Sequence, residues 1–123
     1  MSEDTTTTKI KFQVTIETKT IPPIFTFYNE QHQATNGNAT TYCGEETYIN
    51  YTLSTPDFFF VAPFITNNVN GDFHYGISEQ GQKLIIVDNG QYTDAIGLQL
   101  IVEQQSTGQR YASPDPKIAN RPR

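Results

Sequence analysis

The side chains that could do chemistry in this sequence are few and far apart. Its two histidines, His32 and His74, and its single cysteine, Cys43, lack the short paired spacings of structural zinc sites. A type 1 copper site needs its cysteine and second histidine close together on one loop, and the chain order here does not supply that. Glu45 and Glu46 follow the cysteine and disfavour a reactive thiolate. We therefore expect an inert thiol, no metal site and no cofactor.

Acidic side chains are numerous, but they form no recognisable catalytic or calcium-binding motif. No EF-hand stretch, phosphate-binding glycine loop or serine nucleophile motif is present. We interpret the acidic residues as solvated turn residues and predict that the protein is not an enzyme. The carboxylates that could meet at one end of the fold are Glu45, Glu46, Asp57, Asp72, Asp88 and Asp94.

The charge distribution argues against nucleic acid and membranes as partners. Residues 20–109 carry nine acidic side chains and a single basic one, whereas residues 110–123 carry four basic side chains and one acidic one. An acidic body of this kind repels a phosphate backbone. The longest apolar run, "FFFVAPFI", is far shorter than the ~20 residues of a membrane-spanning helix. The lone cysteine and an N-terminus without an apolar secretory segment favour a cytoplasmic location.

The elements that would position these residues are strands. Ile10, Phe12, Val14 and Ile16 alternate with polar residues, which is the period of a half-solvated antiparallel strand. Further strand-like stretches follow at roughly 8–12-residue spacing. Residues 29–44 are polar and turn-forming, with a strong hairpin signal at residues 36–37, and we expect a long loop or an exposed hairpin there. The pattern predicts an all-β, two-sheet antiparallel sandwich of seven to eight strands.

A local signature makes this sandwich immunoglobulin-like. The stretch "DNGQYTD" places Asp88, Gly90 and Tyr92 with the spacing found before strand F of immunoglobulin domains, where a tyrosine hydroxyl fixes the corner. The chain has no tryptophan, and Asp94 occupies the position of the disulfide cysteine. The similarity to immunoglobulin domains is therefore one of architecture and carries no function.

The C-terminal residues predict a separate, extended segment. We expect a flexible N-terminal tail over residues 1–8, a β-sandwich domain over 9–113 and a proline-rich strap over 114–123. Pro114 and Pro116 favour an extended course along a sheet edge, with Ile118 as the apolar anchor. We prefer a strap that clasps its own domain, and docking on another molecule is the alternative.

The same segment resembles a known family. The stretch "SPDPKIANRP" is similar to the C-terminal signature of the DP-EP family, small bacterial proteins with β-sandwich folds. Asp115-Pro116 matches this signature, followed by Ile118, Asn120 and Pro122, whereas Arg121-Pro122 stands where Glu-Pro is expected. The resemblance implies a bacterial origin, an immunoglobulin-like sandwich and no assigned activity or catalytic residues.

The most unusual apolar feature is the phenylalanine-rich stretch that begins at Phe58. If Phe58 and Phe60 face the core, alternation exposes Phe59. Either the 29–44 loop covers this side chain, or the strand offers an interaction surface, together with the C-terminal segment. The candidate interface residues are Phe58, Phe59, Phe60, Phe64, Asp115, Pro116, Ile118 and Arg121.

Two functional hypotheses remain open. The first is a non-catalytic module that binds a partner or self-assembles as a homo-oligomer. The alternative is a domain that binds carbohydrate or another small ligand, because aromatic rings with neighbouring polar groups suit sugars. The aromatic residues for such a site are Tyr42, Tyr48, Tyr51 and Tyr75.

Overall fold

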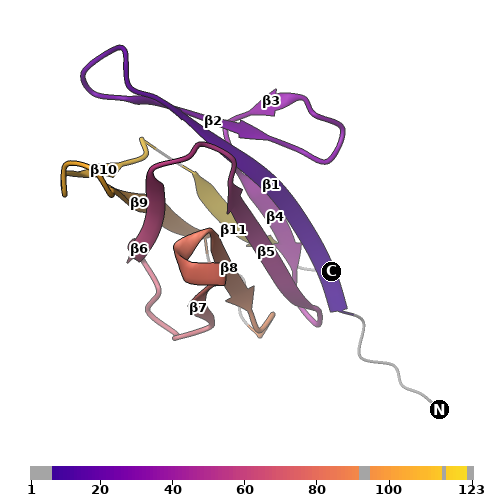
Figure 1. Ribbon diagram of the computed structural model, residues 1–123. Helices are drawn as coiled ribbons and strands as arrows, with labels where there is room; N and C mark the ends of the chain where they lie inside the picture. The colour runs from indigo at the N-terminus through magenta and orange to yellow at the C-terminus, as the bar shows by residue number, and fades with distance from the viewer. Residues whose placement is uncertain (1–6, 92–94, 115, 122–123) are drawn as a thin grey trace.

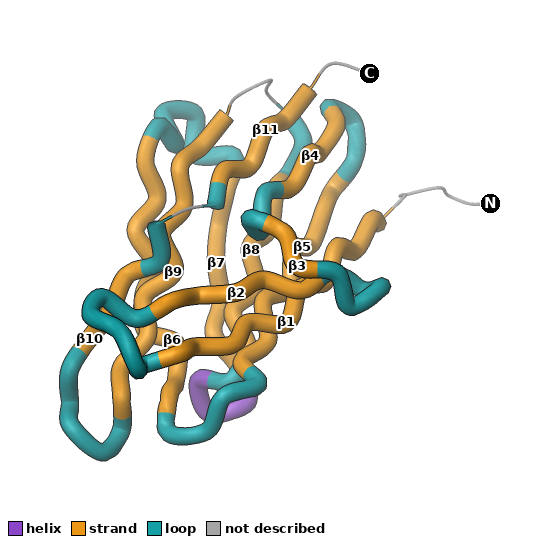
Figure 2. Tube along the Cα trace, turned by 90° about the horizontal axis from the view of Figure 1, so that it is seen from above, coloured by secondary structure: helices purple, strands orange, loops and turns teal. Residues whose placement is uncertain are grey.

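The computed structural model describes residues 7–91, 95–114 and 116–121, which form two packed β-sheets (Figures 1 and 2). Sheet A has the strand order β3-β2-β1-β5-β8-β7. In sheet B, β9 pairs with β6 on one side and with β10 and β11 on the other, and β4 follows β11. The elements are β1 (Thr7–Glu17), β2 (Ile24–Tyr28), β3 (Ala34–Thr35), β4 (Ala39–Tyr42), β5 (Glu46–Leu53), β6 (Phe58–Thr66), β7 (Phe73–Ser78), the 3-10 turn η1 (Glu79–Gly81), β8 (Lys83–Asp88), β9 (Ala95–Gln104), β10 (Arg110–Ala112) and β11 (Lys117–Arg121).

This architecture confirms the predicted all-β sandwich but corrects its details. Both sheets are mixed rather than wholly antiparallel, because β1 pairs with β5 and β4 pairs with β11 in parallel. The described residues form more strands than the seven to eight expected, since the polar 29–44 segment itself supplies β3 and β4. Sheet A is strongly twisted, and in Figure 2 β1 and β2 run across the direction of β7.

The core lies between the two sheets and follows the predicted alternation. In β1, Phe12, Val14 and Ile16 are buried, while the polar residues between them face outward. The ring of Phe12 stacks on Tyr51 of β5 with 5.3 Å between ring centroids. Burial raises the pKa of the Tyr51 hydroxyl. That hydroxyl donates a hydrogen bond of 3.0 Å to the carbonyl of Gly37, so the polar end of this ring is satisfied inside the core.

The 29–44 segment is ordered and connects the two sheets. Its tight turn is residues 29–33, where the Asn29 side-chain oxygen accepts the backbone N–H groups of Gln31 and Gln33 at 3.0 and 2.9 Å. Asn36-Gly37 is not the hairpin turn that was expected but the crossing from β3 in sheet A to β4 in sheet B. Gly37 has φ 79°, and a β-carbon there would lie 2.8 Å from the ring of Phe27. The close packing of this crossing explains the glycine.

The C-terminal segment is an internal strand, which corrects the expected course along a sheet edge. β11 pairs with β9 on one side and with β4 on the other. The prolines fall in an interruption between β10 and β11, where the Ser113 hydroxyl accepts the Leu100 N–H at 3.0 Å and the Pro116 carbonyl accepts the Leu98 N–H at 3.0 Å. Because the missing proline N–H groups lie in this interruption, the strand that follows can still pair on both sides.

Candidate functional site

Four of the eight predicted interface residues are buried. Phe58, Phe60 and Ile118 are buried hydrophobic core residues, and Pro116 is also buried. Phe58, Phe60 and Ile118 pack between the two sheets, so they do not form an accessible surface. Phe64 is 56% exposed on the outer side of sheet B.

The other three candidate interface residues, Phe59, Asp115 and Arg121, do not belong to the described core. Phe59 is half-buried, and its cover is η1 rather than the 29–44 segment, since a β-carbon on Gly81 would lie 2.6 Å from the Phe59 Cβ. Asp115 lies outside the described residues, as does the side chain of Arg121. The phenylalanine-rich strand therefore buries Phe58 and Phe60 and leaves Phe59 and Phe64 partly accessible.

The tyrosines proposed as a sugar platform do not come together. Tyr51 is fully buried in the core. Tyr42 lies on β4 in sheet B, whereas Tyr48 and Tyr75 lie on β5 and β7 in sheet A. Because aromatic recognition of a sugar needs rings that line one concave surface, this set does not form the expected site.

Two of the predicted carboxylates meet in a buried cluster at one end of the sandwich. The Asp88 carboxylate accepts the Thr41 hydroxyl and, at 2.9 Å, the Gly90 N–H. The Asp72 carboxylate accepts the Gln91 N–H at 3.0 Å. Burial raises the pKa of Asp88, and the nearby Asp72 charge acts in the same direction, whereas the Thr41 and Gly90 hydrogen bonds oppose it. This cluster ties β4, β8 and the neighbouring turns together.

The other chemical candidates are dispersed. Asp57 lies in the β5–β6 turn, where it accepts the Ser106 N–H at 3.0 Å and so joins that turn to the β9–β10 turn. Tyr92 and Asp94 of the predicted corner lie outside the described residues. Within residues 7–91, 95–114 and 116–121, no group of three histidine, cysteine or acidic side chains could hold a metal ion. No helix in the same ranges is long and apolar enough to cross a membrane.

The first surface with the properties of a functional site is the free edge of sheet A. Among the described strands β7 pairs with β8 only (Figure 1). Residues 74–78 of β7 are all exposed. Tyr75 and Ile77 are 47% and 38% exposed. Gly76 within this strand is a sequence signal that could have indicated the edge, but the prediction placed the interface on the phenylalanine-rich strand.

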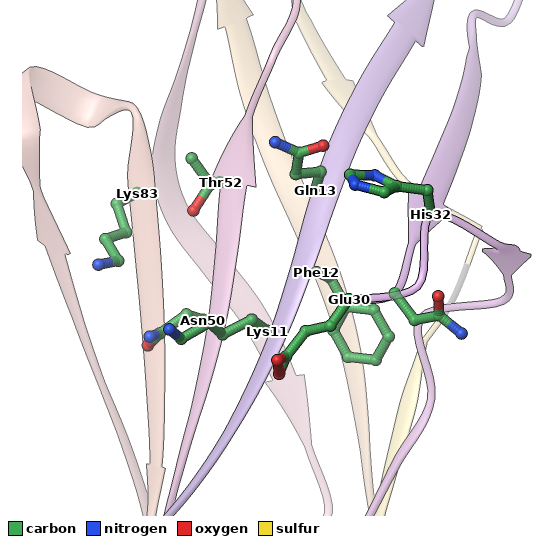
Figure 3. Close-up of a pocket in the computed structure, with 9 residues that line it drawn as sticks. Lys11, Phe12, Gln13, Glu30, His32, Asn50, Thr52 and Lys83 are labelled. Carbon is green, nitrogen blue, oxygen red and sulfur yellow. The ribbon is translucent and has the colours of Figure 1, made fainter.

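The second surface with the properties of a functional site is a polar hollow of about 380 Å³ on the outer face of sheet A (Figure 3). Its floor comes from β1, β5 and β8, and one wall comes from the turn between β2 and β3. Sequence reasoning missed this hollow because its residues are spread over most of the chain. The lining residues are Lys11, Phe12, Gln13, Asn29, Glu30, His32, Asn50, Thr52 and Lys83.

Comparison with known proteins adds a family and a distant structural likeness. The model of the DP-EP family matches residues 8–122, almost the whole chain rather than the C-terminal stretch alone. No curated protein sequence matches this one. The crystal structure of the inclusion body protein PixA from Burkholderia cenocepacia is similar at 7% identity and a TM-score of 0.40, over 98% of this chain and 99% of that one.

Proposed function

The chain belongs to the DP-EP family, and we propose that it is a non-catalytic sandwich module that self-associates through the β7 edge of sheet A. Two copies would pair their β7 strands antiparallel and join two six-stranded sheets into one. The observation that carries the proposal is an unprotected, self-complementary edge strand. A cytoplasmic location, where the half-buried Cys43 would remain a free thiol, fits this proposal.

The backbone of β7 offers hydrogen-bonding groups to a partner strand. The Asn68 side chain accepts the Phe73 N–H at 3.2 Å and donates to the Phe73 carbonyl at 2.9 Å, so both Phe73 groups point away from β8. Because backbone direction alternates along an antiparallel strand, the N–H and C=O groups of Tyr75 and Ile77 point the same way. Asn68 thus takes up the outward hydrogen-bonding groups of Phe73 and leaves those of Tyr75 and Ile77 available to another chain.

The side chains of β7 suit pairing with a second copy. In an antiparallel pair centred on Gly76, Tyr75 faces Ile77 of the other copy twice, and His74 faces Ser78. Aromatic side chains opposite β-branched ones are favourable cross-strand pairs. Residues 74–78 carry no lysine, arginine or acidic side chain, so the pairing brings no like charges together despite the acidic body. A β-carbon on Gly76 would meet no atom within 4 Å, which leaves room at the centre.

Strand β6, which forms one edge of sheet B, provides the contrast. β6 contains Pro63 and a register shift between Val61 and Phe64, both of which hinder strand addition. β7 contains neither a proline nor a described register shift. β6 therefore carries two features that protect a sheet edge and β7 carries neither of them, as expected if β7 is the assembly element.

The proposal is tested by the mass of the full chain in solution over a concentration series, using light scattering. We expect a dimer of twice 13.9 kDa. Ile77→Lys should give a monomer, and so should Ile77→Pro, which removes an outward N–H without disturbing the pairing with β8. Val69→Lys is the matched control, because Val69 is an 83% exposed apolar residue outside β7. A wild-type chain that stays monomeric at millimolar concentration, or a Val69→Lys variant that dissociates as readily as Ile77→Lys, refutes the proposal.

A further inference from the structure

We infer that the hollow on the outer face of sheet A binds a small hydroxylated organic anion of the sugar-acid class. The inference is independent of self-association, because the hollow lies over β1, β5 and β8 and not over the β7 edge. Its volume of about 380 Å³ falls within the range of small-molecule sites.

The strand register arranges the floor of the hollow as two rows. Lys11 lies opposite Asn50 on β5, and in the next row Gln13 lies opposite Thr52, which in turn lies opposite Lys83 on β8. The two lysines therefore flank the two polar β5 side chains, one from each side. Figure 3 shows Thr52 between Lys83 and Gln13.

The wall is a defined turn rather than a loose loop. The His32 N–H donates to the Asn29 carbonyl at 2.9 Å, and the Asn29 N–H donates to the Gln33 carbonyl at 3.0 Å. This turn places Glu30 and His32 beside the floor. In Figure 3 the imidazole of His32 points toward Gln13. The hollow thus has fixed polar groups on two sides, as a small-molecule site requires.

Asn50 and Thr47 are the two described residues with a buried side-chain oxygen that lacks a hydrogen-bond partner, and of these Asn50 lines the hollow. Its side chain is only 9% exposed, and its Oδ1 atom is buried without a hydrogen-bond partner. A buried unsatisfied acceptor is unfavourable for folding, and an apolar residue beside its sheet partner Ile85 would avoid the cost. An acceptor held in a polar hollow at the expense of stability is expected where a ligand hydroxyl completes the hydrogen bond.

The charges define the ligand class. Lys11 and Lys83 contribute two ammonium groups, although Lys83 is the only basic residue between residues 20 and 109. The Lys83 Nζ lies 3.9 Å from a Glu79 carboxylate oxygen, a loose pair that leaves it able to contact a ligand. A ligand carboxylate can pair with either of the two lysines, and ligand hydroxyl groups can donate to Asn50 and to the Glu30 carboxylate. A neutral sugar leaves the lysines without an anion, and inorganic phosphate offers poorer donors to Asn50.

The test is a titration of the isotope-labelled full chain followed by amide NMR shifts, with D-glucuronate as the probe. D-glucose and inorganic phosphate are the comparison ligands. We expect saturable shifts at the floor residues with D-glucuronate and affinities at least about tenfold weaker for the other two. Equal binding of D-glucose overturns the anion requirement, and equal binding of phosphate overturns the hydroxyl requirement. Shifts confined to another face, or no saturation with D-glucuronate, overturn the site.

Single-residue variants test which side chains of the hollow bind D-glucuronate. Lys83→Gln should weaken D-glucuronate binding about tenfold or more, because it removes a charge-assisted contact. Lys19→Gln removes an equal charge from an exposed residue outside the hollow and should leave the affinity unchanged. Asn50→Val should abolish binding and raise the melting temperature, a combination that mere loss of structure cannot produce. Unchanged affinity in Asn50→Val refutes the inference. Because Ile77→Lys lies outside the hollow, it should bind as wild type, so failure of self-association would not affect this result.

Discussion

Replacement of Ile118 by alanine tests the internal position of the C-terminal strand. Ile118 is fully buried, and its register partners are Ile96 on β9 and Ala39 on β4. Truncation of a buried isoleucine to alanine costs about 2–5 kcal/mol, since the cavity does not refill. With a urea dependence of about 2 kcal/mol per molar, the unfolding midpoint should fall by roughly 1–2.5 M. That loss is a large part of the about 5–15 kcal/mol that stabilises a typical domain.

The assay is urea unfolding followed by circular dichroism, with two graded controls. Ile118→Val should cost only about 0.5–1.5 kcal/mol, because one methylene is removed. Lys117→Gln should be close to neutral, since Lys117 is exposed. A chain that ends at Ser113 should not fold, because β9 and β4 would lose the strand between them. If Ile118→Ala unfolds at the wild-type midpoint, or if the shortened chain is folded, the segment is a dispensable strap and the reasoning is wrong.

Two further predictions concern the polar end of the sandwich. Because the folded-state pKa of Asp88 is raised, its contribution to stability is complete below the ordinary pKa of about 4 and is lost as pH rises through the folded value. Asp88→Asn should therefore gain stability relative to wild type as pH rises above about 4, by about 1.4 kcal/mol for each unit of pKa elevation, and parallel pH profiles of the two proteins would contradict this. Gly90→Ala should destabilise by about 2–4 kcal/mol, since φ is 74° and the new β-carbon would lie 2.1 Å from the Glu45 carbonyl oxygen. Gly108→Ala is the control, because φ is 75° there but an added β-carbon would meet no atom within 4 Å. It should lower the free energy of unfolding by only about 1–2 kcal/mol, the cost of the left-handed backbone alone. Equal losses for the two variants in thermal unfolding would exclude the clash with Glu45.

The two proposals have a joint consequence for binding. An antiparallel β7 pair has its two-fold axis perpendicular to the sheet, so both hollows would face the same side. Five strand spacings of about 4.8 Å would separate the two β5 strands, which gives a lateral distance of about 24 Å. A polymer of uronate residues should then bind the wild-type dimer more tightly than the Ile77→Lys monomer, through avidity. Single D-glucuronate molecules should bind both equally.

What the sequence by itself determined is the character of individual strands. The alternation from Ile10 to Ile16 predicted which side chains of β1 are buried, because period-two patterning places every second residue on one face. The spacing of the strands and turns predicted an all-β sandwich, and the C-terminal "SPDPKIANRP" indicated the DP-EP family. The alternation within a strand and the turn residues between strands are local features, so each can be recognised in a short stretch of sequence.

Only the tertiary structure decided which strands are neighbours. The parallel pairing of β1 with β5, and of β11 with β4, joins segments that no hairpin connects. Pro114 and Pro116 suggested that the C-terminal segment lies at a sheet edge. Instead, the Ser113 hydroxyl accepts the Leu100 N–H where the β10–β9 pairing is interrupted, and β11 pairs with β9 beyond this point as an internal strand. The hollow depends on the same long-range register, which brings Lys11, Asn50 and Lys83 onto one face. Periodicity specifies a face of a strand but not its partner, since pairing is decided by packing over the whole chain.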